Sequence, residues 1–286
     1  MIAKTKKGDF YMNKLESCYK NCIGTKFLLP QIVIEQAKII VSQFEAKSRV
    51  GRPKIELERG LNGIFYILKT GIQWNALPHC FGSNSAIHRL FQWLTQKGFF
   101  EQLWHRELME YDKKQGLRLA TQAADCSHIK APLGKEKTGK SPVDRRKLGT
   151  KRSIIVEENG LVVGCALGPG NRHDSQLFEA SIRTIPTFLR QPQYKEMHLD
   201  SAYDSTKIQV MLFNYYYVPR INKNNRRANK PIKLIRNERK RWIVESTHSW
   251  MNRFRRLLIR FEKRANNYLA FMQLSFAIMT FNKLRI

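Results

Sequence analysis

Acidic residues are scarce in this sequence. Its 286 residues contain 23 Asp and Glu against 51 Lys and Arg, which gives a formal net charge of +28 at pH 7. Such a surplus disfavours an acidic small-molecule enzyme or an acidic partner protein. It favours a polyanion or an anionic surface as the partner, without distinguishing DNA, RNA and membrane surface. Hydrophobic residues make up 42% and aromatic residues 11% of the chain, so it is predicted to be globular rather than a disordered basic tail.

Cysteine is sparse as well. The five cysteines are scattered, at Cys18, Cys22, Cys80, Cys126 and Cys165. An odd, scattered set makes a poor disulfide framework, and no Cys/His pair at zinc-ligand spacing follows Cys18 and Cys22. The N-terminus also has no apolar run of signal-peptide length. These features together predict a cytoplasmic protein.

Long hydrophobic runs are missing too. The longest, Ala270 to Phe281, spans about 12 residues and contains Gln273, Ser275 and Thr280. A bilayer-spanning helix needs about 20 apolar residues, so this run predicts a buried helix and no membrane association.

The first part of the chain has helical patterning. Residues 1–26 are polar and weakly patterned, which predicts a flexible lead-in. Across 27–115 apolar residues recur at helical spacing, and two amphipathic helices flank a short turn after Thr70. We therefore expect a helical, helix-turn-helix-like DNA-binding domain over 27–115, with Asn84 and Arg89 as candidate base contacts. Short helical domains also serve dimerisation, which is the alternative.

Residues 116–286 alternate between strand and helix patterns. The predicted strands are 119–125, 153–156, 161–167, 197–200 and 215–221, and the predicted helices are 174–183, 205–213, 238–260 and 271–284. Three strands that include a hairpin, followed by helix, strand, helix, strand and two helices, predict an α/β fold. We expect a ribonuclease-H-like catalytic domain over 116–286, with a mixed sheet flanked by helices.

Three carboxylates fall on the elements of this sheet. Asp125 ends the first predicted strand, Asp200 ends the fourth, and Glu245 lies on the long helix predicted to pack across the sheet. The two strands are neighbours in this order, so the aspartates are expected to share one crevice. Converging carboxylates suit hard divalent cations. Two such ions activate a water or a 3′-hydroxyl and stabilise the leaving oxygen of a phosphodiester.

Each acid also has an ordinary structural explanation. Aspartate is common in turns at strand ends, which applies to Asp125. One of Asp200 and Asp204 is expected to cap the next helix, and we assign that role to Asp204. Glu245 is also placed to pair with Arg241 on a helix surface, four residues away.

The helix that carries Glu245 has two distinct faces. Its apolar stripe consists of Ile243, Trp250, Phe254, Leu257 and Phe261. The polar face consists of Arg241, Glu245, His248 and Asn252, at i, i+4, i+7 and i+11. This pattern suits a helix that holds metal and contacts phosphate, and a solvated amphipathic helix is the alternative. His248 is predicted to be a polar contact, not a metal ligand.

Several strings of the sequence have the form of known sequence motifs. Asp125-Cys126-Ser127 resembles a first-aspartate motif D-x-S/T, and HLDSAYDS (198–205) resembles a second, usually D-x-G-Y-D-S. RWIVESTHSWMNRFRRL (241–257) is similar to the glutamate motif, and 144–175 is similar to the hairpin and N-x-H-D turn between them. From about residue 50 to the end, the chain resembles bacterial insertion-sequence transposases of the DDE type, especially the insertion sequence 5 family.

The chain departs from this pattern at three positions. Ala202 replaces the usual glycine of the second motif, which is expected to stiffen that turn. Glu238 and Asn252 stand where a broader grouping of relatives carries tyrosine and lysine. The roles that those relatives give to tyrosine and lysine therefore do not carry over to Glu238 and Asn252. The role implied for Glu245 is unaffected.

The resemblance implies a Mg²⁺-dependent transposase. Asp125, Asp200 and Glu245 would hold two Mg²⁺ ions, for which Mn²⁺ could substitute. The enzyme would cleave the ends of its insertion sequence and join their 3′-hydroxyls to target DNA by transesterification. Its implied partners are double-stranded terminal inverted repeats and target DNA, bound by a homodimer or higher oligomer. A nuclease of the same fold that does not join strands, and a catalytically inactive DNA-binding derivative, are the alternatives.

Basic residues concentrate around the glutamate helix. Between Arg220 and Arg264 there are 16 Lys and Arg against three Glu, and a second basic patch runs from Lys135 to Arg152. Such clustering predicts steeply salt-dependent DNA binding, although much of the charge is expected to act non-specifically. The candidate DNA contacts here are Lys147, Arg152, Arg172, Arg241, His248, Asn252, Arg253 and Arg256. His173 and Asp174 are further candidates, and Asp174 also suits a helix cap.

Overall fold

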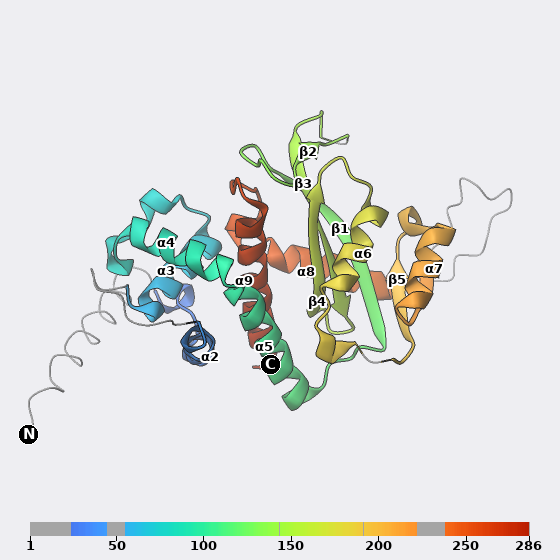
Figure 1. The fold of residues 1–286 in the computed structure, drawn as a ribbon, viewed down its shortest axis with the longest axis horizontal. Helices are drawn as coiled ribbons and strands as arrows, with labels where there is room; N and C mark the ends of the chain where they lie inside the picture. Colours follow the sequence, from blue (N-terminus) through green and yellow to red (C-terminus); the bar gives the residue numbers. More distant parts are fainter. Residues whose placement is uncertain (1–23, 45–54, 143, 191, 222–237, 286) are drawn as a thin grey trace, which may run out of the picture. The chain divides into compact units, whose positions relative to one another are not determined.

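The computed structural model describes residues 24–44, 55–142, 144–190, 192–221 and 238–285 (Figure 1). The chain divides into two compact units, Met1–Leu103 and Trp104–Ile286. The division falls within helix α5 (Phe99–Gln115), whereas the sequence pattern changes after residue 115. Most of the expected lead-in, 1–26, lies outside the described residues.

The described part of the first unit is helical. It contains α2 (Gln31–Ser42), α3 (Leu57–Thr70) and α4 (Asn84–Gln96), with short 3-10 turns η1 (Thr25–Phe27), η2 (Trp74–Ala76) and η3 (His79–Phe81). Helix α3 ends at Gly71, whose φ of 74° is a left-handed conformation that glycine adopts without strain. Both η2 and η3 lie between α3 and α4. This connection is therefore longer than the turn of about 3–4 residues that joins the helices of a helix-turn-helix. The short turn predicted there is therefore wrong.

The second unit is built on a mixed sheet. Among the described residues its strands are β1 (Thr121–Lys130), β2 (Gly139–Lys140), β3 (Leu148–Glu157), β4 (Val162–Pro169), β5 (Lys195–Leu199) and β6 (Tyr217–Ile221). The order is β2-β3-β1-β5-β6, and β4 pairs with β3. Strand β3 is antiparallel to β1 and β4, while β1, β5 and β6 are parallel. Apart from the short β2, this is the ribonuclease-H-like arrangement expected from the sequence.

Helices cover both faces of the sheet. Helix α6 (Asp174–Arg183) and helix α8 (Glu238–Met251) lie on opposite faces (Figure 1). Neighbouring residues of β3 show the same division, because Ser153 accepts a hydrogen bond from Ser181 of α6, whereas Arg152 donates one to Asn252, directly after α8. Successive strand residues point to opposite faces, so the two helices sandwich β3. Helix α7 (Thr206–Asn214) connects β5 to β6.

The C-terminal helices differ from the sequence prediction. Helix α8 ends at Met251 instead of near 260, and a 3-10 turn, η7 (Arg255–Leu257), follows it. Phe254 and Leu257 are buried although they are not on the helix, while Phe261 is 43% exposed. The predicted continuous apolar stripe is therefore wrong beyond Met251.

The expected buried C-terminal helix is present. Helix α9 (Ala265–Lys283) begins earlier than predicted and is mostly buried along its length. Within the described ranges, no helix is long and apolar enough to cross a membrane.

Candidate active site

The two aspartates lie at the same level of neighbouring parallel strands. Asp125 is in the middle of β1, opposite Ile154 of β3, so its predicted place at a strand end is wrong. The parallel pairing of β1 with β5, however, ends at Ala123 and His198. Asp125 and Asp200 each lie two residues beyond that last pair, and Asp200 directly follows β5. The predicted adjacency of the two strands is confirmed.

Helix α8 brings the glutamate to the same place. It packs against β1, β3 and β5, and it carries both Arg241 and Glu245. The Arg241 guanidinium lies 3.3 Å from Asp200 Oδ1 through Nη1, and 3.5 Å from Glu245 Oε1 through Nη2. One guanidinium therefore spans the carboxylate after β5 and the carboxylate on α8.

The third carboxylate belongs to the same electrostatic environment. The pKa of Asp125 is raised to about 6, chiefly by burial and also by the negative charges of Asp174 and Glu245, although the Cys126 amide and Arg241 lower it. The side chains of Asp200 and Glu245 are more accessible, at 44% and 55% exposed. Asp125 is thus the most buried of the three acids.

Comparison with known proteins identifies the family. Residues 119–280 match the family "Transposase DDE domain", and residues 35–104 match "Putative transposase of IS4/5 family". The chain belongs to the DDE transposases. Membership makes it an enzyme that acts on DNA in transposition and implies the use of divalent metal ions.

Two curated relatives come from Burkholderia cepacia. The "Putative transposase for insertion sequence element IS402" is 32% identical to this transposase over 159 residues, which cover 53% of this chain and 72% of that protein. The "Insertion element IS402 uncharacterized 16.2 kDa protein" is 30% identical over 95 residues, or 32% of this chain and 64% of that protein.

The solved structures found by comparison are much more distant. The piggyBac transposase synaptic complex with hairpin DNA shares 11% identity with this transposase, with a TM-score of 0.44 over 93% of this chain and 73% of that one. The catalytic domain of the Mos1 mariner transposase shares 10% identity, with a TM-score of 0.26 over 64% and 92% of the two chains.

The residue types of the site fit a divalent metal, whereas their arrangement here does not form a metal site. Carboxylate oxygens are the ligands that hard divalent cations prefer. In the described part of the chain, however, no group of three or more His, Cys, Asp and Glu side chains is placed to hold an ion. The side chain between Asp200 and Glu245 is a cation, Arg241.

A buried arginine fixes α8 to the sheet beside the site. Arg152 of β3 is 1% exposed, and it donates hydrogen bonds to Ser127 Oγ at 2.5 Å and to Asn252 Oδ1 at 2.7 Å. Ser127 follows Asp125 by two residues, so both point to the same face of β1. Arg152 therefore links the strand of Asp125 to the end of the helix of Glu245.

Three of the predicted DNA contacts are buried in the transposase. Arg152, His248 and Arg256 are each at most 7% exposed, so they are not available to a duplex in this structure. Arg256 forms a 2.6 Å ion pair with Glu262, which is also buried. Burial and the positive charge of Arg152 lower the pKa of His248 to about 3, which keeps it neutral.

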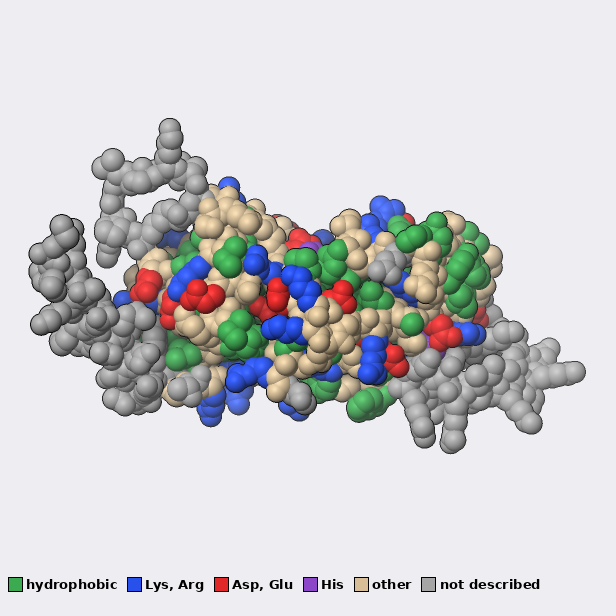
Figure 2. All heavy atoms as spheres, turned by 90° about the horizontal axis from the view of Figure 1, so that it is seen from below, with side chains coloured by type: hydrophobic (Ala, Val, Ile, Leu, Met, Phe, Trp, Pro, Cys, Tyr) green, Lys and Arg blue, Asp and Glu red, His purple; other side chains and the backbone are tan. Residues whose placement is uncertain are grey.

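The other predicted contacts remain on the surface. Lys147, Arg172, Arg253 and Arg89 are exposed, and Asn84 is partly exposed. Asn252 is exposed as a residue, although its amide oxygen is bonded to Arg152. On the face drawn in Figure 2, Lys and Arg side chains lie in scattered groups with acidic side chains between them. The cationic surface is therefore spread out and is not one continuous stripe on this face.

The sequence placed the helix caps near the site on the wrong residues. Ser205 caps α7 by accepting a hydrogen bond from the Ile208 amide, so the cap is not Asp204 as predicted. The carboxylate of Asp200 accepts a hydrogen bond from the Ser201 amide. Ala202, in place of the usual glycine, has no positive φ, so glycine is not required in this turn.

The start of α6 adds a fourth acid near the site. His173 caps the helix by accepting a hydrogen bond from the Ser175 amide, and Asp174 is the first helical residue. Asp174 forms a 2.6 Å ion pair with Lys151 of β3 and raises the pKa of Asp125. Lys151 could not be predicted from the sequence, because a lysine within a strongly basic stretch carries no distinguishing signal.

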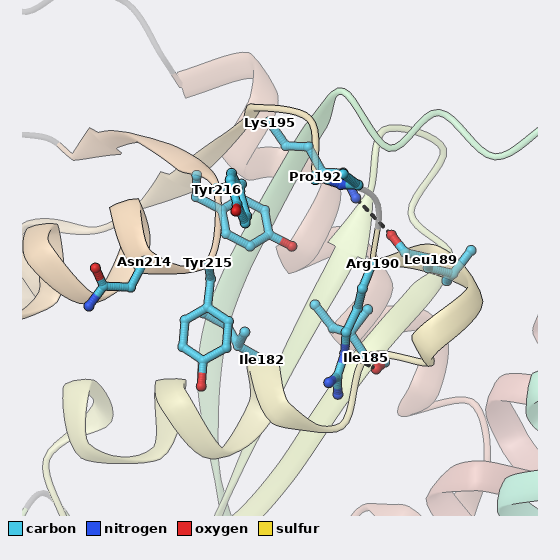
Figure 3. Close-up of a pocket in the computed structure, with 10 residues that line it drawn as sticks. Ile182, Ile185, Leu189, Arg190, Pro192, Lys195, Asn214, Tyr215 and Tyr216 are labelled. Atoms are coloured by element: carbon cyan, nitrogen blue, oxygen red, sulfur yellow. Dashed lines mark hydrogen bonds between the residues drawn. The ribbon is translucent and has the colours of Figure 1, made fainter.

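The transposase also has a pocket far from these acids (Figure 3). Its lining includes Ile182, Lys195, Tyr215 and Tyr217. Lys195 and Tyr217 are the first residues of β5 and β6, whereas Asp200 follows the last residue of β5. The pocket therefore lies at the opposite end of these strands from Asp200. Lys195 Nζ already donates a hydrogen bond to the Leu189 carbonyl at 2.8 Å. The pocket is therefore not part of the candidate active site.

Proposed function

We propose that this transposase cleaves the phosphodiester bonds at the ends of its insertion sequence and joins the resulting 3′-hydroxyls to target DNA. Asp125, Asp200 and Glu245 are the catalytic carboxylates of this proposal. The observation that supports it best is the position of Arg241, whose guanidinium contacts Asp200 and Glu245 and influences the pKa of Asp125. Three carboxylates that are far apart in sequence are therefore all influenced by the charge of one arginine.

The three carboxylates would hold two Mg²⁺ ions, for which Mn²⁺ substitutes. Bound ions of this kind activate the attacking oxygen and stabilise the leaving oxygen of a phosphodiester. The chain itself contributes the rigid positions of its acids. The position of Asp125 is held by the pairing of β1 with β3 on one side and with β5 on the other. The position of Glu245 is held by the packing of α8 against these three strands.

The proposed partner is double-stranded DNA, both as terminal inverted repeats and as target. A net charge of +28 supports it, together with exposed cations such as Lys147, Arg172 and Arg253. We assign recognition of the repeats to the helical domain of residues 27–115 and catalysis to 116–286. Because two ends must be joined together, the active form is a homodimer or higher oligomer, at work on the nucleoid in a bacterial cytoplasm.

A strand-transfer assay tests this function. Pre-cut ends with free 3′-hydroxyls are incubated with a target plasmid, Mg²⁺ and either the wild type or Glu245→Gln. We expect joined products from the wild type and a loss of about 100-fold or more in the variant. Glu179→Gln, which removes an exposed glutamate of α6 paired with Arg183, is the matched control and is expected to retain activity.

The same assay separates the alternatives. Cleavage of intact ends without any joining would make the protein a nuclease of the same fold. Equal products, or equal absence of products, from the wild type and Glu245→Gln would indicate a DNA-binding derivative without this chemistry.

A further inference from the structure

Arg241 occupies the position where the acids of the site face one another. Its side chain is 23% exposed, and its two terminal nitrogens point to different carboxylates, one to Asp200 and one to Glu245. Its positive charge also lowers the pKa of Asp125. A guanidinium presents its donors in a planar fork, which suits it to bridge two carboxylates in this way.

The arrangement occupies one oxygen of the Asp200 carboxylate, Oδ1. Asp200 Oδ1 accepts a hydrogen bond from the Ser201 amide at 2.6 Å and a second from Arg241 at 3.3 Å. A metal ion that binds through Oδ1 competes for the lone pairs that these donors use. Because the Ser201 amide is fixed in the backbone and the arginine side chain is not, Arg241 is the partner that can leave.

We propose that Arg241 is an internal counter-ion that holds Asp200 and Glu245 together in the metal-free transposase, and that it must move away when a divalent ion binds. Arg241 is then a positioning residue that lowers metal affinity before DNA is bound. The proposal rests on the assignment of Asp125, Asp200 and Glu245 as metal-holding residues. It accounts for a structure in which carboxylates of suitable chemistry face a cation of the chain instead of forming a metal site.

A general charge effect must be separated from this bridging contact. Any cation near the site weakens metal binding through its field, whether or not it touches the acids. Lys151 is the matched case, because it lies near the same site and contacts Asp174, not Asp200 or Glu245. Lys151→Gln therefore removes one positive charge beside the site and leaves the Arg241 bridge in place.

The experiment is a Mn²⁺ titration of the full chain in the absence of DNA, followed by electron paramagnetic resonance of the free ion. It compares the wild type with Arg241→Gln, Lys151→Gln and Asp125→Asn. Loss of the two charge-assisted hydrogen bonds is expected to tighten Mn²⁺ binding about tenfold in Arg241→Gln, and removal of Lys151 about twofold at most. Asp125→Asn is expected to bind Mn²⁺ weakly or not at all.

Arg241→Lys provides a second variant if removal of the charge disturbs folding. It keeps the positive charge, but its single ammonium cannot bridge both carboxylates as a fork. We expect its Mn²⁺ affinity to lie between those of the wild type and Arg241→Gln. The melting temperature of each variant in EDTA and in Mn²⁺ confirms that it is folded. Mn²⁺ is expected to raise that temperature more in Arg241→Gln than in the wild type.

The outcomes distinguish this inference from the proposed function. Unchanged or weaker binding in Arg241→Gln, an equal gain in Lys151→Gln, or no binding in any variant would overturn the role of Arg241. In the first two cases, a loss of binding in Asp125→Asn would leave the proposed function standing. Unchanged binding in Asp125→Asn would instead contradict the ligand assignment, and with it the proposed function.

Discussion

Arg152 and Asn252 are one hundred residues apart in sequence and joined by a hydrogen bond of 2.7 Å. Arg152 is buried in β3, and Asn252 is the first residue after α8. The contact connects the sheet that carries Asp125 with the helix that carries Glu245. It also gives Asn252 a structural role, since a cation at this position would face the buried arginine.

We expect Asn252→Ala to destabilise the protein. The substitution takes one acceptor from a cation that is 1% exposed, and the loss of such a partner typically costs about 1–3 kcal/mol. Urea unfolding measures the effect, and Arg253→Ala at the neighbouring exposed position is the control, with an expected change of at most about 0.5 kcal/mol. Equal stability of Asn252→Ala and the wild type would show that Arg152 does not depend on this contact.

Arg253 and Arg256 are predicted to behave in opposite ways. Arg253 is exposed, whereas Arg256 is buried in an ion pair with Glu262. Arg253→Ala is expected to weaken DNA binding and to reduce the slope of log K against log salt by about 1, without a loss of stability. Arg256→Ala leaves a buried carboxylate unpaired and is expected to cost about 3–5 kcal/mol of folding free energy.

Fluorescence-anisotropy titrations over a series of salt concentrations measure the first effect, and urea unfolding measures the second. A salt slope that falls in Arg256→Ala while its stability is kept would contradict the burial of this arginine. It would place Arg256 on the DNA-binding surface, as its sequence neighbourhood suggested.

Many of the individual strands and helices were accessible from the sequence because they depend on local patterns. The β-branched run around Ile154 and Ile155, the turn at Gly160 and the helix start at Asp174 each have short-range signals, and the structure confirms the elements they predict. The triad acids could be chosen because acidic residues are rare in this chain. The position of Asp125 within β1 was missed because the polar residues after it do not look like a strand, although they pair with β3 as far as Lys130.

Features set by long-range contacts could not be read in this way. No glycine or proline lies between Met251 and Phe261 to indicate that α8 ends. The chain leaves the helix and returns to the sheet, where the Arg260 amide bonds to the Lys130 carbonyl and the buried Arg260 guanidinium bonds to Thr150. Nothing local distinguishes Arg152, Arg256 and Arg260 from surface arginines, because their burial depends on partners elsewhere in the chain.

Glu107 gives a prediction for the pH dependence of stability. This residue of α5 is 2% exposed, and its Oε1 has no hydrogen-bond partner. Burial first, and the negative charge of Glu110 second, raise its pKa from 4.5 to about 7. Between these two values the folded state binds more protons than the unfolded state, so stability falls as the pH rises through that range.

Glu107→Gln is expected to remove this dependence. The variant should gain about 1–3 kcal/mol over the wild type at pH 8, where the wild-type carboxylate is charged, and nothing below about pH 4.5, where it is neutral in both states. Urea unfolding at pH 4.5, 6 and 8 measures the difference. Glu179→Gln, at an exposed glutamate of α6, is the control and should show no such trend. A gain that is the same at every pH would mean that the charge of Glu107 is not its cause.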